Sequence, residues 1–180
     1  MLQIFSKLNT NILLQKTMQN FILEIDFFSD ELKVLVLNKK IVFFTQFLKY
    51  HTHFLLNTII DITAYDNISN KKRFGVEYLL LSTVWNKRIA IEVKTDEVTW
   101  VPTITSVFAG ANWCEREIFD LFGIIFEDHA DLRRILTDYG FQGHPLRKDF
   151  PLTGFVEVRF DENSKSIVYN TTSLAQEFKG

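Results

Sequence analysis

The spacing of hydrophobic residues changes several times in the first forty residues. Hydrophobic residues recur every three or four positions over residues 2–18, which predicts an amphipathic helix. Hydrophobic and acidic residues then alternate in residues 21–28, as a half-buried strand requires. A second short apolar run covers residues 32–37, after a Ser-Asp-Glu turn. These two runs predict a β-hairpin.

Residues 41–50 predict a second helix, although they are rich in β-branched and aromatic residues. The residues expected along one side of this helix are Val42, Phe43, Phe47 and Tyr50.

Three further strands are expected before residue 100. They cover residues 59–64, 74–85 and 88–95, and an Asn-Lys turn joins the last two into a second hairpin. Residues 66–73 are polar and predict a mobile connection. The order of elements predicts an α+β fold: a two-layer domain with helices on one face of a mixed or antiparallel sheet.

A further helix is expected shortly after Pro102, which itself suits the first turn of a helical segment at residues 103–108. Asn112 with Glu115 three residues later resembles a capping box, so the longer helix is expected to begin there. Gly123 suits a left-handed end to that helix. The side expected to be buried comprises Cys114, Ile118, Leu121 and Phe122.

Little regular structure is expected beyond Gly123. A turn near residues 132–136 and a hairpin of residues 155–160 and 166–169 are the exceptions. We therefore expect an α+β domain at residues 1–123, followed by a loop and an extended C-terminal tail at residues 124–180.

Composition narrows the classes of function. The chain has 180 residues, is 47% hydrophobic and contains 18 Phe, enough for a folded core. A net charge of −2 does not favour binding to nucleic acid or to an anionic membrane. The single Cys114 excludes an internal disulfide and any iron–sulfur or zinc-thiolate site built by this chain alone. No apolar run approaches the roughly 18–20 residues that cross a bilayer, so association with a membrane is expected only through a partner.

Charge, glycine and large aromatic residues are concentrated in residues 115–151. Glu115 and Glu117 suggest an acid/base pair, but residues two apart on a helix point about 200° apart and cannot share a substrate. Arg116 and Asp120, four apart, are positioned to pair. We expect this side of the helix to face solvent or an interface.

Metal and nucleophile chemistry fit less well. His129 and His144, with Glu127, Asp128 or Asp131, have the ligand types of a two-His, one-carboxylate site, but their spacing matches no common pattern. Cys114 is expected to be a core thiol. A free-standing metal or acid/base enzyme remains an alternative hypothesis.

What remains in this region is the composition of a protein interface, rich in arginine and aromatic residues. An isolated domain is expected to leave so many close charges unsatisfied, and a larger acidic partner to satisfy them. The candidate docking residues are Glu115, Arg116, Glu117, Asp120, Gly123, His129, Leu132, Arg133, Arg134, Asp138, Gly143, Pro145, Arg147, Lys148 and Asp149.

The run EREIFDLFGIIFEDHADLRRILTDYGFQGHPLRKDFPLTG at residues 115–154 closely resembles the signature of a known family. This is the thirty-kilodalton subunit of respiratory complex I, NADH:ubiquinone oxidoreductase, which is the ninth subunit in mitochondrial nomenclature and the C-type subunit in bacteria. The resemblance continues weakly through residues 61–64 and 74–85, and downstream to residue 178. One departure is Ala130 after His129, where the family usually has proline.

The resemblance implies a core subunit of the hydrophilic arm, without catalytic, cofactor-binding or metal-binding residues of its own. FMN, iron–sulfur clusters and ubiquinone then belong to other subunits. The implied partners are the forty-nine-kilodalton subunit, over which the tail runs, and neighbouring iron–sulfur subunits. The implied location is the matrix side of the mitochondrial inner membrane or, alternatively, the cytoplasmic face of a bacterial plasma membrane. The matching subunit of a plastid-type dehydrogenase or of a membrane-bound hydrogenase is the rival assignment.

Overall fold

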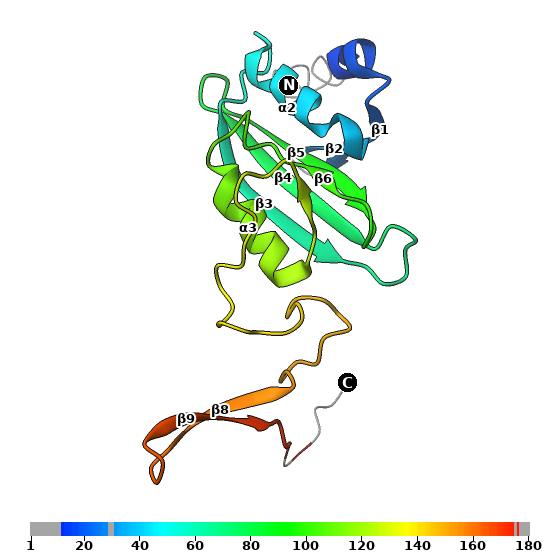
Figure 1. Ribbon diagram of the computed structural model, residues 1–180. Helices are drawn as coiled ribbons and strands as arrows, with labels where there is room; N and C mark the ends of the chain where they lie inside the picture. Colours follow the sequence, from blue (N-terminus) through cyan, green and yellow to red (C-terminus); the bar gives the residue numbers. More distant parts are fainter. Residues whose placement is uncertain (1–11, 29–30, 175, 177–180) are drawn as a thin grey trace.

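The protein consists of a sheet with helices on one side and a C-terminal arm that extends away from it (Figure 1). The computed structural model describes residues 12–28, 31–174 and 176. Residues 12–18 are helical, and the rest of the helix predicted over residues 2–18 lies outside the described residues. Among the described residues, no helix is long and hydrophobic enough to cross a membrane.

Five strands form the main sheet, in the order β1-β2-β5-β4-β3. Parallel pairing joins β2 to β5, and the other neighbours are antiparallel. The mixed sheet and the two predicted hairpins, β1–β2 and β4–β5, are therefore confirmed. The strands are β1 (Ile22–Phe28), β2 (Glu31–Val36), β3 (Thr58–Asp66), β4 (Phe74–Ser82) and β5 (Lys87–Thr95).

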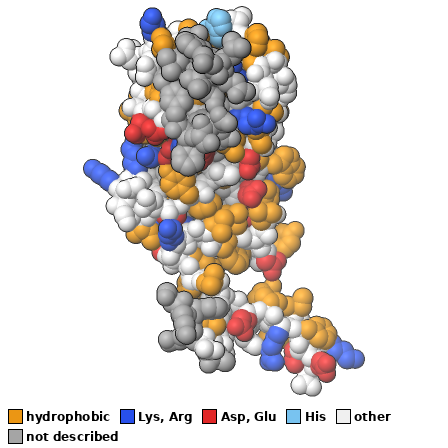
Figure 2. Space-filling model, turned by 180° about the vertical axis from the view of Figure 1, so that it is seen from behind, with side chains coloured by type: hydrophobic (Ala, Val, Ile, Leu, Met, Phe, Trp, Pro, Cys, Tyr) orange, Lys and Arg blue, Asp and Glu red, His pale blue; other side chains and the backbone are white. Residues whose placement is uncertain are grey.

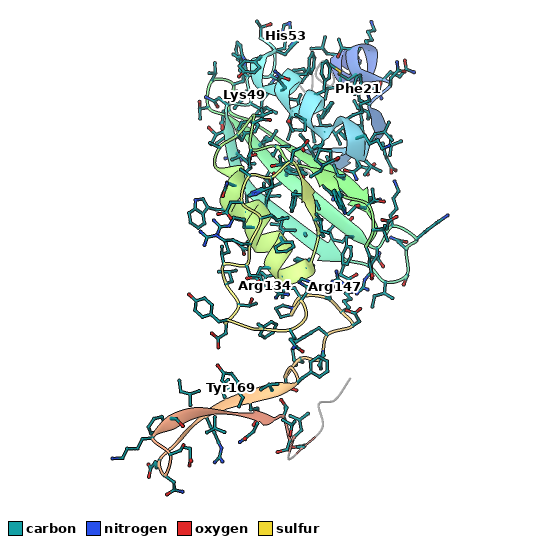
Figure 3. The ribbon with its side chains drawn as sticks, viewed as in Figure 1. Phe21, Lys49, His53, Arg134, Arg147 and Tyr169 are labelled. Atoms are coloured by element: carbon teal, nitrogen blue, oxygen red, sulfur yellow. The ribbon has the colours of Figure 1, made fainter. Side chains whose placement is uncertain are left out.

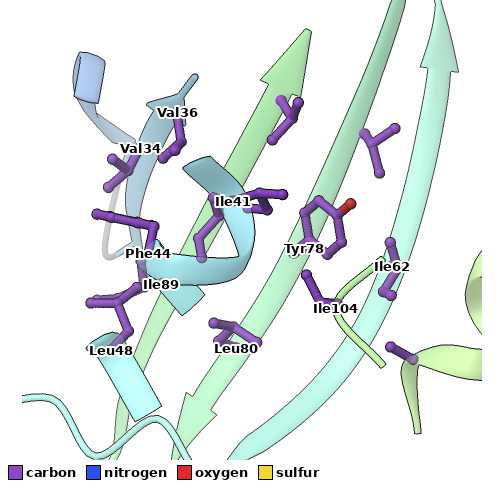
Figure 4. Packing of buried hydrophobic residues seen from close by; sticks show 14 of the residues in the cluster. Val34, Val36, Ile41, Phe44, Leu48, Ile62, Tyr78, Leu80, Ile89 and Ile104 are labelled. Atoms are coloured by element: carbon purple, nitrogen blue, oxygen red, sulfur yellow. The ribbon is translucent and has the colours of Figure 1, made fainter. Parts of the chain in front are cut away.

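One face of this sheet carries the core. Val34 pairs with Ile91, and Ile91 pairs with Tyr78, so these side chains lie side by side on the same face. All three side chains are completely buried. The helices cover this face, as the two-layer prediction requires (Figure 4).

The opposite face carries a cluster of charged residues. Glu77 and Glu92 are register partners on β4 and β5. Lys33 Nζ lies 3.5 Å from a Glu77 carboxylate oxygen and 3.1 Å from one of Glu92. The Tyr65 hydroxyl donates to Glu92, and its ring fills the space that a Cβ on Gly75 would occupy. A network of charged side chains thus lies on the face of the sheet that the helices do not cover.

Helix α2 (Ile41–Tyr50) follows a short 3-10 turn, η1 (Asn38–Lys40). Its buried residues are Ile41, Phe44, Thr45 and Leu48, and Figure 4 shows the three apolar ones facing β2, β4 and β5. On the expected side, Val42 and Phe47 pack partly against the core, while Phe43 and Tyr50 are exposed. Apolar residues occupy most sides of this helix, so the 3.6-residue period did not single out the side that meets the sheet.

Helix α3 (Ala111–Phe122) packs beside β3 and ends at Gly123, whose φ of 75° confirms the predicted left-handed end. Its N-cap is Gly110 without a side-chain cap bond, so the capping box predicted at Asn112 is wrong. The Glu115 side chain instead accepts hydrogen bonds from Thr103 and Ile104, which precede the helix.

The segments before and after α3 pair with each other as two short parallel strands. Strand β6 (Val101–Pro102) pairs with β7 (Phe126–Glu127), so Pro102 lies in a strand and does not begin a helix. Residues 104–108 form a hydrogen-bonded turn. The predicted turn at residues 132–136 is also wrong, because residues 132–135 have no regular structure and the bend begins at residue 136.

The C-terminal hairpin is confirmed. Strand β8 (Val156–Asp161) pairs with β9 (Ser166–Thr171) antiparallel, and the hairpin lies apart from the main sheet (Figure 1).

Candidate docking site

Three of the four charged residues of α3 are buried, contrary to the expectation of a solvent-facing or interface-facing side. Glu115 and Asp120 have no exposed surface, and Arg116 is 5% exposed. Glu117 alone among these four is exposed. The expectation failed because the groups that accommodate these charges come from segments distant in sequence, which helical spacing cannot reveal.

Asp120 anchors the start of the arm. Its Oδ2 accepts the backbone N–H groups of Ile135 (3.1 Å), Leu136 (2.8 Å) and Thr137 (2.9 Å). The Thr137 hydroxyl and Arg134 Nη1 donate to Oδ1, at 2.6 and 3.3 Å. Burial raises the pKa of Asp120, but these hydrogen bonds outweigh it and lower the pKa to about 2. In a turn, backbone carbonyls would accept these N–H groups. Here the Asp120 carboxylate accepts them, so the segment does not need to form a turn.

The C-terminal end of α3 is capped by the same arm. The last carbonyls of a helix lack intrahelical donors. His144 Nδ1 donates to the Asp120 carbonyl (2.9 Å), the Leu146 N–H to the Leu121 carbonyl (3.1 Å), and Arg147 Nε to the Phe122 carbonyl (2.5 Å). Figure 3 places Arg134 and Arg147 at this end of the helix.

Gly123 is required where the arm crosses the helix end. A Cβ there would lie 2.5 Å from His144 Nε2 and 2.6 Å from Arg147 Nη2. The positive φ and the close approach both exclude a larger residue without a local shift.

Arg73 forms a second anchor. Its Nε and Nη2 donate to the two carboxylate oxygens of Asp66, both at 2.6 Å. Its Nη1 lies 3.0 Å from the Asp149 carboxylate, and the Lys148 N–H donates to Asp66 at 2.8 Å. Hydrogen bonds from Arg73 lower the pKa of Asp66 and of Asp149. The guanidinium groups of Arg73 and Arg147 both stack on the Phe74 ring.

This anchor was missed in the sequence, where residues 66–73 were expected to be a mobile connection. That expectation was wrong at both ends of the segment, which are fixed by the Asp66–Arg73 pair. Opposite charges at the two ends of a hairpin loop were the available signal. Their third partner, Asp149, lies far away in sequence and could not be inferred.

The charges of the signature run are therefore largely satisfied inside the chain. The expectation that they need an external acidic partner was wrong for Arg134, Arg147 and Asp149. Arg133 differs: its side chain is 69% exposed, and its one ionic partner among the described residues is the exposed Asp131, at 3.0 Å. Besides Arg133, the exposed charged candidates that form no ion pair among the described residues are Glu117, Asp138 and Lys148.

Glu115 and His129 form a buried pair. Glu115 accepts hydrogen bonds from the Thr103 hydroxyl (2.5 Å) and the Ile104 N–H (2.9 Å), and its other close neighbour is His129 Nε2 at 3.8 Å. Burial raises the pKa of Glu115 to about 7, although the two hydrogen bonds act in the opposite direction. Neither side chain is exposed, so no substrate reaches this pair.

The residues considered as candidate metal ligands, and set aside on their spacing, are not grouped as a site. Within the described ranges, no three His, Cys, Asp or Glu side chains are grouped as a metal site. His129 Nδ1 accepts the Asp131 N–H, and His144 caps α3. Cys114 is half-buried against the core, and burial raises the pKa of its thiol.

The remaining candidates shape the arm. Leu132 packs against the core, Pro145 is half-buried, and Gly143 has a φ of 93°. A Cβ on Gly143 would lie 2.7 Å from the Phe150 ring. Asp138 accepts a hydrogen bond from the Tyr169 hydroxyl of β9 at 3.3 Å, which ties the loop to the hairpin.

The terminal hairpin has one apolar face. The pairing of Val158 with Tyr169 and of Phe160 with Ile167 places these four side chains on the same face, together with Val156. Each of the five is at least half exposed. Next to this face, the loop and the hairpin enclose a groove of about 770 Å³, whose apolar lining includes Tyr139, Phe141, Phe150, Leu152, Phe155 and Tyr169.

Figure 2 shows this end of the molecule standing away from the domain, with hydrophobic side chains on its surface. A two-stranded hairpin is at best marginally stable in water without further packing. Its apolar face and the adjoining groove together form the exposed hydrophobic surface of the arm.

Comparisons with known proteins place the chain in a family. Residues 34–156 match the family model of the respiratory-chain NADH dehydrogenase, 30 Kd subunit. The chain is 51% identical over 150 residues to the C-type subunit of the NADH-quinone oxidoreductase of Chelativorans sp. (strain BNC1), covering 83% of this chain and 75% of that protein. It is 53% identical over 133 residues to the NADH dehydrogenase [ubiquinone] iron-sulfur protein 3 of Oryza sativa subsp. japonica, covering 74% and 70%.

A solved structure shares the fold. It is a chain of the membrane-bound sulfane sulfur reductase, an archaeal respiratory membrane complex, with a TM-score of 0.68 and 22% identity, covering 90% of this chain and 98% of that one. The family match and the two relatives confirm the resemblance seen in residues 115–154, and the chain belongs to the thirty-kilodalton subunit family of respiratory-chain NADH dehydrogenase, complex I.

Proposed function

We propose that this chain is a scaffold that holds the quinone-reducing module of the proton-pumping NADH:ubiquinone oxidoreductase together. It is a subunit of the peripheral arm of that complex and contributes no redox group. Its domain is residues 1–123, and residues 124–180 are the docking segment. Electron transfer from NADH to ubiquinone takes place on other subunits, which hold FMN, the iron–sulfur clusters and the quinone.

The observation that carries this proposal is the apolar face of the terminal hairpin. Its five large side chains, Val156, Val158, Phe160, Ile167 and Tyr169, are exposed on a projecting element. Fully burying an exposed side chain of this kind contributes about 1.5–3 kcal/mol, and these five are a little over half exposed, so a partner that covers the face gains roughly half of that from each. The forty-nine-kilodalton subunit is the partner we propose for this face, with iron–sulfur subunits beside it.

The anchors support this role. Asp120 and the Arg73–Asp66 pair fix the loop at residues 134–149 against the domain, so the hairpin projects from a rigid root. A preorganised arm loses less conformational entropy on binding than a flexible tail. The arm is thus built to hold two subunits at a set separation.

The composition of the chain supports a role without a redox group. A cluster needs several thiolate ligands, and this chain has only Cys114. The proposed location is the matrix face of the mitochondrial inner membrane, with the cytoplasmic face of a bacterial plasma membrane as the alternative. The relatives include both plant and bacterial proteins. Contact with the membrane runs through the complex alone, and nucleic acid is not a partner.

The test is retention of the chain in the purified complex. Val158→Asp places a charge in the middle of the apolar face, whereas Arg159→Asp changes the neighbouring residue, which points to the other face. On native gels probed for the NADH-oxidising and forty-nine-kilodalton subunits, we expect Val158→Asp to remove the chain from the complex and Arg159→Asp to leave it there. Normal assembly with Val158→Asp would refute the docking role. Co-migration with hydrogenase subunits instead would favour the rival assignment.

A further inference from the structure

Arg116 is buried without an acceptor. It is 5% exposed, and among the described residues its Nε has neither a hydrogen-bond partner nor contact with solvent. Arg133, Arg134 and Arg147, the other arginines of the signature run, all have acceptors within the chain. Removing a guanidinium from water is costly unless an anion or acceptors replace the water. The Nε itself is enclosed, so an external anion would reach the guanidinium at its terminal nitrogens, which are not among the fully enclosed atoms without a partner.

The neighbouring acids are already occupied. Asp120 lies four residues further along α3, on the same side as Arg116, but its oxygens accept from residues 134–137. Glu115 accepts from Thr103 and Ile104. Within the part of the chain that the structure describes, no carboxylate lies within 4.0 Å of Arg116, and the i,i+4 pair expected with Asp120 is not formed. The missing anion must come from elsewhere.

Trp113 holds the guanidinium in position. The Arg116 Cζ lies 4.9 Å from the centre of the Trp113 ring, one helical turn away. Trp113 itself is 63% exposed. This contact holds the guanidinium beside an exposed ring, and the terminal nitrogens of a guanidinium are well suited to donate to a planar carboxylate. Tryptophan and arginine are also the residues most enriched where binding energy concentrates in interfaces.

We propose that Trp113 and Arg116 form a docking point for a single carboxylate, from an Asp or Glu side chain of a neighbouring protein of the complex. This inference rests on the proposed function, because it requires the chain to be built into a complex. The docking point lies on α3 of the domain and is separate from the hairpin face.

The surroundings select a single carboxylate over a polyanion. Glu117 is exposed one turn beyond Trp113, and it repels an extended anionic surface. Only 5% of Arg116 is exposed, so the small opening at its terminal nitrogens favours a narrow side chain over a phosphate backbone. The net charge of −2 likewise offers no general attraction to nucleic acid or anionic lipid.

The test compares the free full-length chain with the assembled complex. Arg116→Met keeps the length and apolar contacts of the side chain and removes the donors. A docking role predicts an unchanged or raised Tm of the free chain, since an unsatisfied cation is removed. In the complex, the same variant should lower the amount of chain retained after a high-salt wash at least about tenfold. Trp113→Ala should act in the same direction, and Tyr50→Ala, which removes an equally exposed aromatic from α2, should not.

Two results would overturn the inference. The first is a fall in the Tm of the free chain with Arg116→Met, which would show that Arg116 stabilises the domain itself. The second is normal, salt-resistant retention of both Arg116→Met and Trp113→Ala. If the unmodified chain fails to co-migrate with the complex, the proposed function fails instead, so the two failures are distinguishable.

A crosslink identifies the contact directly. With a photo-reactive phenylalanine analogue in place of Trp113 in the intact complex, we expect a crosslink to another subunit within a few residues of an Asp or Glu. A crosslink confined to this chain, or to a segment without an acid, contradicts the proposal.

Discussion

The main sheet and the terminal hairpin are both amphipathic. Among the described residues, helices cover the apolar face of the sheet, whereas nothing covers that of the hairpin. Ile41, Phe44 and Leu48 of α2 close the core face of the sheet. The apolar face of β8 and β9 has no such cover within the described residues. The same alternation of residues thus produces a folded core in one region and an exposed surface in the other. Whether a second layer of the chain lies opposite the strands makes the difference.

The largest expected effect comes from breaking the closed face. Phe44→Ala removes a fully buried ring and should lower the free energy of unfolding of the full chain by about 3–5 kcal/mol. Phe160→Ala on the hairpin removes a ring that is 63% exposed and should change it by about 0.5 kcal/mol or less. Chemical denaturation of the two purified variants measures the difference. Equal losses would mean that the hairpin is not an open surface.

The buried carboxylate of Glu115 gives the domain a pH dependence. Its pKa in the fold is about 7, against an ordinary value of 4.5, so the fold favours the neutral form. The resulting stability is fully present below pH 4.5 and is lost as pH rises through 7, by up to about 3 kcal/mol. Glu115→Gln should lack this loss, so its stability relative to the unmodified chain should rise between pH 5 and 8. The free energy of unfolding is measured from denaturation curves at each pH. If it differs between the two proteins by the same amount from pH 5 to pH 8, Glu115 does not have a raised pKa in the fold.

Asp120→Ala should loosen the root of the arm. It removes the acceptor for three consecutive N–H groups and should destabilise the chain by about 2–3 kcal/mol. Hydrogen exchange of the Ile135, Leu136 and Thr137 amides should accelerate, while that of the β4 amides changes less. Glu117→Ala, exposed on the same helix, is the matched control. Unchanged protection of the three amides would show that Asp120 is not the anchor.

The smallest expected effects on stability are those of substituting Arg147 and Arg133. Arg147→Ala removes the cap on Phe122 and the stack on Phe74, and should lower stability by about 1–2 kcal/mol. Arg133→Ala, on an exposed side chain, should change the stability of the free chain by no more than about 0.5 kcal/mol. We expect both to reduce the amount of assembled complex on native gels, Arg147 through the position of the arm and Arg133 through direct contact. Normal assembly with both substitutions would remove Arg133 from the interface and limit Arg147 to a local role.

Much of the fold followed from local patterns. Alternation and turn residues predicted β1, β2, β4 and β5, and Gly123 predicted the end of α3. The parallel contact of β2 with β5 was not specified, because it joins segments separated by more than fifty residues. Pro102 was misassigned for a similar reason, since its strand partner β7 lies across the whole of α3.

The candidate site was located by composition, but its workings were not. The concentration of charge singled out residues 115–151 as the candidate site, and the family signature falls in the same residues. Solvent was expected around Glu115 and Asp120 because a charged residue on a helix is usually exposed. Their burial depends on donors from Thr103 and from residues 134–137, and no local rule connects these segments.

By itself, the sequence determined the α+β class, the three hairpins and the family, because these depend on short-range periodicity and on a long run of matching residues. Only the tertiary structure decided which charges are satisfied within the chain and which remain for a partner. The reason is physical: hydrogen bonds and ion pairs act over a few ångströms, so a buried charge is accommodated by whatever the fold brings next to it. Arg134, Arg147 and Asp149 find such neighbours, while Arg116 and the apolar face of the hairpin find none within the described chain.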